Sequence, residues 1–62
     1  MNLLAPQHAA RRVRLSVSRL AQLDRAGVLP ALRDSAGRRF FEAEAVERFA
    51  VEREQKRAAA AA

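Results

Sequence analysis

Two turn signals within the run from Ser16 to Phe49 constrain the fold of this chain more than any other feature. Gly27-Val28-Leu29-Pro30 follows a helical pattern, and Asp34-Ser35-Ala36-Gly37 separates two short segments that combine apolar and basic residues. Gly tolerates a positive φ and Pro cannot continue a helix, so the first signal ends a helix. The second has the composition of a hairpin turn. The order helix, hairpin, helix predicts a fold that is mainly α with a small β-hairpin.

A further helix is expected before this run. Residues 1–5 read as a short lead-in, and Pro6 suits the first turn of a helix because its missing N–H would be unpaired there anyway. We expect this helix to run from Pro6 to about Val13, with Ala9, Ala10 and Val13 on one face. Such small side chains permit close packing between helices.

The second helix is predicted over about residues 17–26, with the Ser16 hydroxyl as its cap. Its buried stripe consists of Val17, Leu20 and Leu23. The opposite stripe is polar and rich in hydrogen-bond donors, and its members are Ser18, Gln22 and Arg25, with Arg19 on the flank. Any solvated amphipathic helix shows such a stripe, so the stripe alone does not establish a binding face.

Leu32-Arg33 and residues 38–41 are the predicted strands of the hairpin, and a third helix is predicted from about Ala43. Two strands alone are marginal in water, so we expect Leu32 and one or both of Phe40 and Phe41 to pack against the helices.

The hairpin carries Arg33, Arg38 and Arg39. Charges on a hairpin often keep its edge from pairing with another chain, and they also suit contact with a polyanion. Neighbouring strand residues point to opposite faces, so only one of Arg38 and Arg39 is expected to face such a partner.

Composition favours a nucleic-acid partner and excludes several other classes. The chain has 62 residues and a net charge of +5, and all but one of its 12 basic residues are Arg, whose planar guanidinium suits phosphates and guanine edges.

It has no Cys and one His, His8, so neither a disulfide nor a metal site is expected. No paired nucleophile and base and no glycine-rich phosphate loop are present, so no enzyme activity and no cofactor are expected. No apolar stretch approaches the roughly 20 residues of a membrane span, which predicts a protein of the cytoplasm with no membrane partner.

In their order and spacing, these pieces resemble the excisionase group of the MerR-like winged helix-turn-helix superfamily. The resemblance runs from Pro6 almost to Arg53. The segments that carry it are residues 5–12, Leu15-Ser16, Gly27-Val28-Leu29-Pro30, Gly37-Arg38-Arg39-Phe40-Phe41 and Ala45-Val46-Glu47-Arg48-Phe49. The chain departs from the family pattern at Arg14, where Gly is usual, and at Ala5, where a Ser or Thr cap is usual.

The resemblance implies that the second helix reads the major groove and that the hairpin, as the wing, contacts the neighbouring backbone or minor groove. It places Ser18, Arg19 and Gln22 at base edges, with Arg25 on the same helix. It places Arg33, Arg38 and Arg39 at phosphates. The implied partners are double-stranded DNA, a phage integrase and neighbouring copies of the chain on DNA, and the implied location is the nucleoid of a bacterial host cell.

Residues 1–57 are predicted to form a single DNA-binding domain, and residues 58–62 an Ala-rich tail with no assigned function. Two alternatives remain open at this point. The first is a small transcriptional regulator of the same superfamily. The second is an antitoxin-like or adaptor module that binds another protein through one face of the third helix, formed by Val46, Phe49, Ala50 and Arg53.

Overall fold

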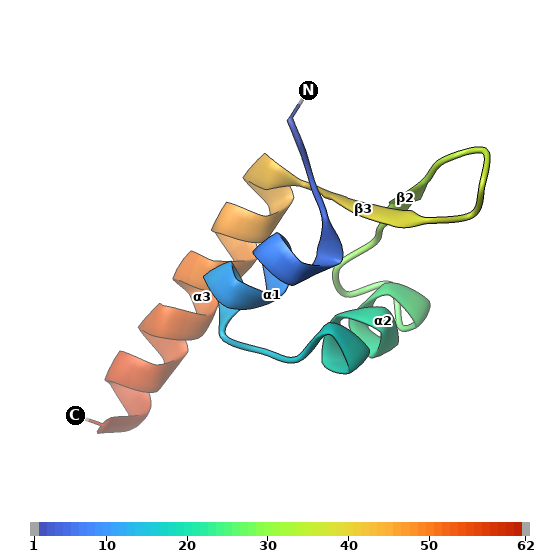
Figure 1. Ribbon diagram of the computed structural model, residues 1–62. Helices are drawn as coiled ribbons and strands as arrows, with labels where there is room; N and C mark the ends of the chain where they lie inside the picture. The colour runs from blue at the N-terminus through green and yellow to red at the C-terminus, as the bar shows by residue number, and fades with distance from the viewer. Residues whose placement is uncertain (1, 62) are drawn as a thin grey trace.

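A computed structural model describes residues 2–61, which form three helices and a small three-stranded antiparallel sheet (Figure 1). The elements in chain order are β1 (Leu3–Leu4), α1 (Pro6–Val13), α2 (Val17–Arg25), β2 (Leu32–Arg33), β3 (Arg39–Glu42) and α3 (Ala43–Ala61). The prediction of a mainly α fold with a β-hairpin is therefore confirmed. Met1 and Ala62, the outer ends of the predicted lead-in and tail, lie outside the described residues.

The sheet has the order β1-β3-β2, so β3 is its central strand. β2 pairs with β3 as the expected hairpin, with Arg33 opposite Arg39. On the other edge Leu3 pairs with Glu42, and the Asn2 carbonyl accepts the Ala43 N–H at 2.8 Å. The prediction that residues 1–5 are only a lead-in was wrong here. A strand of two residues shows no alternating pattern in the sequence, and it forms only because it pairs with β3.

Local signals set the ends of the helices as expected. Pro6 begins α1, and the preceding Ala5 supplies no side-chain cap. The Ser16 hydroxyl accepts the Arg19 N–H at 3.0 Å, which confirms the predicted cap of α2. α2 ends at Arg25, one residue before the predicted end, and Gly27 follows with a φ of 76°. This left-handed residue turns the chain toward the hairpin.

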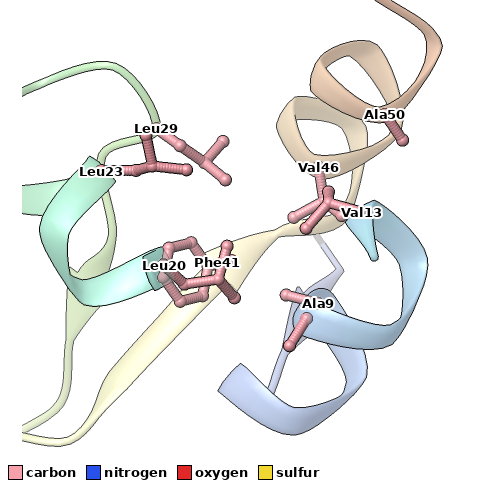
Figure 2. Close-up of a cluster of buried hydrophobic side chains, with 9 residues drawn as sticks. Ala9, Val13, Leu20, Leu23, Leu29, Phe41, Val46 and Ala50 are labelled. Carbon is pink, nitrogen blue, oxygen red and sulfur yellow. The ribbon is translucent and has the colours of Figure 1, made fainter. Parts of the chain in front are cut away.

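The helices and β3 enclose one apolar core, of which Figure 2 shows the side chains. Leu20 and Phe41 fill the space between α2 and β3, while Val13 and Val46 meet where α1 packs on α3. The buried residues are Ala9, Ala10, Val13, Leu20, Leu23, Leu29, Phe41, Val46 and Ala50. Ala9, Ala10 and Val13 confirm the predicted face of the first helix.

Two predicted core positions were wrong. Val17 is 45% exposed, because the first turn of α2 extends beyond the body that buries Leu20 and Leu23. Leu32 is 47% exposed, because it lies on the edge strand β2 opposite Phe40. Phe41 alone brings the hairpin fully into the core, and Phe40 is half-buried.

An arginine on α1 binds two carboxylates on α3. Arg12 donates from Nε and Nη2 to the two oxygens of Glu47, at 2.7 and 2.6 Å. Its Nη1 donates to Glu54 Oε1 at 3.2 Å, two turns further along α3. These bonds lower the pKa of Glu47 and raise that of Arg12. The bidentate pair fixes how α1 lies across α3.

The α3 face that would serve an adaptor module is covered only in part within the chain, because Phe49 and Arg53 are half-buried while the other two residues lie in the core. Val46 is fully buried and Ala50 is 2% exposed, both in the core shared with α1. A protein partner therefore cannot dock on these side chains while the chain is folded. Residues 54–60 are exposed, and the helix continues through the Ala-rich segment to Ala61 (Figure 1). No helix within residues 2–61 is both long and apolar enough to cross a membrane.

Candidate nucleic-acid interface

The outward face of α2 carries the polar residues that the sequence singled out. Ser18, Arg19, Gln22 and Arg25 are all exposed. Two of them are already joined, since Arg19 Nη1 donates to Gln22 Oε1 at 2.9 Å. The amide oxygen of Gln22 is thereby engaged, and this pair presents mainly N–H donors to its surroundings. Such a surface is suited to groups that accept hydrogen bonds.

The hairpin is attached to α2 through Asp24, a residue that the sequence reasoning missed. One oxygen of Asp24 accepts the Ala31 N–H at 2.8 Å. The other accepts from Arg39 Nε at 2.9 Å and from Arg33 Nη2 at 3.5 Å. The Asp24 side chain is only 13% exposed, so water screens its attraction to the two arginines only weakly. We call Asp24, Ala31, Arg33 and Arg39 the Asp24 junction.

The protonation of Asp24 reflects this environment. The Ala31 N–H, and then the Arg39 guanidinium, lower the pKa of Asp24 below its usual value. The carboxylate is therefore ionised at neutral pH, and it neutralises part of the positive charge that the two hairpin arginines bring to α2. Arg33 and Arg39 were predicted as phosphate contacts, and in the free protein both are engaged by this carboxylate.

A second aspartate shapes the tip of the hairpin. Asp34 Oδ1 accepts the N–H groups of Ala36 and Arg38, each at 2.9 Å, and Oδ2 accepts from Arg38 Nε at 3.0 Å. Gly37 completes the turn with a φ of 82°. These bonds, led by the Arg38 N–H, lower the pKa of Asp34. The Arg38 side chain nevertheless stays 76% exposed, whereas that of Arg39 is 27% exposed.

Charge is distributed unevenly along the chain. Residues 1–41 contain eight arginines and two aspartates, whereas residues 42–62 contain five glutamates and four cations. Both aspartates accept from arginines of the hairpin. Within residues 2–61, the arginines of α1, α2 and the turn between them that have no carboxylate partner are Arg11, Arg14, Arg19 and Arg25. The net positive charge of the chain therefore lies in residues 1–41, and on α1, α2 and their turn it includes four arginines that pair with no carboxylate.

Fold and charge together bring the predicted residues to one side of the molecule. In Figure 1, α2 and the hairpin lie at the side opposite α3, whose last turns extend away from both. We take the outward face of α2, Arg38 and the Asp24 junction together as the candidate interface. A signal for Asp24 was present in the sequence, since only two acids accompany the eight arginines of residues 1–41. A carboxylate so outnumbered is a natural partner for nearby arginines.

Comparison with known proteins finds no matching family model, no matching curated protein and no matching solved structure. The residues and their geometry are therefore what supports a function for this chain.

Proposed function

We propose that this chain is a winged helix-turn-helix protein that binds duplex DNA sequence-specifically and acts as an excisionase of a phage or another mobile element. The DNA-binding part of the proposal depends on one observation above all. The Asp24 junction holds an arginine-bearing hairpin beside a helix whose exposed face is rich in donors. A helix in the major groove with a wing on the neighbouring backbone requires this arrangement of the two elements.

In this proposal, Arg19 and Gln22 read bases from α2. Guanine presents two acceptors, O6 and N7, to the major groove, and an Arg binds both. With its own oxygen held by Arg19, Gln22 adds donors to the same place. We therefore expect a guanine at the position that this pair contacts. Ser18 and Arg25 lie on the same exposed face of α2 and would contact the edges of the groove.

The hairpin arginines divide into two roles. Arg38 is the most exposed of them and is free to move from Asp34 to a phosphate. Arg39 is largely covered and held by Asp24, so its role is to place the hairpin. This division revises the sequence-based expectation that treated all three arginines as phosphate contacts.

The first test is the salt dependence of binding to a short fluorescein-labelled duplex of mixed sequence. If about four to six phosphates are neutralised, log K should fall with log salt at a slope of about −4 to −5 between about 50 and 200 mM KCl. Replacing Arg38 with Ala should reduce the slope by about one, since one phosphate contact is lost. Fluorescence anisotropy measures both, with Arg57→Ala at the exposed end of α3 as the charge-matched control. An affinity that does not depend on salt would contradict the proposal.

The second test concerns base recognition. A preferred site is first selected from random duplexes with the wild-type protein. Arg19→Ala should then weaken binding to that site by about tenfold to a hundredfold and change binding to mixed-sequence DNA much less. Repeating the selection with the variant should show that one guanine is no longer required. Equal losses on both duplexes would mean that Arg19 contacts only the backbone.

The excisionase role within the proposal is supported by the resemblance of the chain to the excisionase group, which extends from Pro6 almost to Arg53. The small transcriptional regulator shares the same DNA-binding geometry, so the location of the selected site separates the two. Sites that lie in the attachment region of an element with an integrase gene support excision. Sites within a promoter, without such a gene nearby, support the regulator.

A further inference from the structure

Three residues in the described chain adopt a positive φ, and only one of them is not glycine. Gly27 and Gly37 turn the chain after α2 and in the hairpin, at 76° and 82°. The third is Arg14, at φ 59° and ψ 43°, which ends α1. A side chain in this left-handed region is strained, because its Cβ crowds the backbone, whereas Gly adopts the region freely. The turn itself would therefore favour Gly at position 14.

Nothing within the protein compensates for this strain through the Arg14 side chain. The backbone N–H of Arg14 donates to the Ala10 carbonyl, a bond that Gly would make equally well. The guanidinium is exposed and has no hydrogen-bond or carboxylate partner in the part of the chain that the structure describes. A cation near the end of α1 favours the helix dipole, but Arg11 and Arg12 already supply that charge in the last turn.

The position of Arg14 is significant for the proposed DNA complex. It is two residues before Ser16, which caps α2, and the turn that carries it leads from α1 directly into α2 (Figure 1). Arg11, three residues earlier, is also exposed and has no partner within residues 2–61. A helix that enters the major groove carries its preceding turn close to the DNA backbone.

We infer that Arg14 binds a DNA phosphate next to the start of α2, as a contact outside the set that the sequence identified. This inference rests on the proposed DNA binding. The guanidinium exchanges water for phosphate oxygens, and the contact orients the N-terminal end of α2 on the backbone. Gly at position 14 would relieve the backbone strain, but it has no side chain with which to bind DNA. The strained Arg is therefore retained at this turn.

The test compares the wild-type protein with Arg14→Gly and Arg14→Lys on the same labelled mixed-sequence duplex, with thermal unfolding measured by circular dichroism. Arg14→Gly should raise Tm by about 4 °C, since the strain is relieved. It should also weaken DNA binding by about threefold to tenfold and reduce the salt slope by about one. Arg14→Lys keeps the charge and the strain, so it should retain the wild-type salt slope without the rise in Tm.

Opposite changes in stability and affinity identify a binding residue, because a purely structural role would move both in the same direction. Wild-type affinity and salt slope in Arg14→Gly, with DNA binding intact in the wild-type protein, would overturn this inference alone. A lower Tm in Arg14→Gly would also overturn it, since the turn would then require the Arg side chain. Absence of binding by the wild-type protein would overturn both this inference and the proposed function.

Discussion

Phe41→Ala is expected to leave most of the protein unfolded at about 25 °C. Phe41 is fully buried and is among the largest side chains of the core. Truncating a buried Phe to Ala costs about 3–5 kcal/mol, from lost burial and from the cavity left behind. A domain of this size gains only about 3–5 kcal/mol in total from one apolar core. Urea titration followed by far-UV circular dichroism measures the loss.

Phe40→Ala is the matched control, because it removes the same atoms from the neighbouring residue. Phe40 is half-buried and faces Leu32 across the hairpin. Its replacement should cost about 1 kcal/mol and leave the domain folded. Equal stability of the two variants would show that β3 does not hold Phe41 in the core as described.

The sequence left the choice between these two phenylalanines open for a physical reason. Neighbouring strand residues face opposite sides of a sheet, so the pattern shows that one ring points inward without showing which. The register decides it: Phe41 lies opposite Leu4 of β1 on the helix-covered side, and Phe40 lies opposite Leu32. The pairing of Phe41 involves β1, a strand that two residues of sequence do not reveal.

Asp24→Asn is expected to loosen the hairpin from α2 and to reduce the ability to select a DNA site. Asn keeps an oxygen for the Ala31 N–H but loses the charge that holds Arg39 at 2.9 Å. Loss of the ion pair at this largely covered site should lower Tm by about 5–10 °C at neutral pH. Affinity for the selected site should fall severalfold. Affinity for mixed-sequence DNA should be retained or rise, because the arginines released from Asp24 become available to phosphates.

The same variant has a pH signature. The pKa of Asp24 is lowered in the folded protein, so the ionised carboxylate stabilises the fold at pH values above the usual Asp pKa of about 4. This stabilisation is lost as the pH falls below that value and Asp24 becomes protonated. The difference in Tm between wild type and Asp24→Asn should therefore be largest near neutral pH and shrink by about pH 3. Glu52→Gln, an exposed residue of α3, is the control and should change neither Tm nor site selection. A wild-type Tm and wild-type site selection in Asp24→Asn would rule out the junction as the link between helix and hairpin.

Local chemistry made the helices predictable. Pro6, Ser16 and Gly27 each act through their own backbone or side chain within a few residues, so the bounds of α1 and α2 follow closely from sequence. The start of α3 at Ala43 agrees as well.

The candidate site was predictable only in part. The exposed face of α2 follows from helical spacing, and its four polar residues lie there. The partners of the hairpin arginines do not follow from spacing, because Asp24 and Arg39 are 15 residues apart and meet only when the hairpin folds onto α2. The sequence therefore identified the arginines, but it did not identify Asp24, whose carboxylate determines which hairpin arginines are available to bind phosphates.

The order in which the elements contact one another has a consequence for synthesis of the protein. β1 pairs with β3, and the apolar face of α1 packs on α3, so the first two elements depend on the last two. Contacts between such distant segments close only after the intervening chain is present, which slows folding compared with a purely local helical hairpin. A nascent chain that stops before α3 therefore exposes the side chains of α1 and α2 that the finished protein buries, and it offers them to chaperones and proteases.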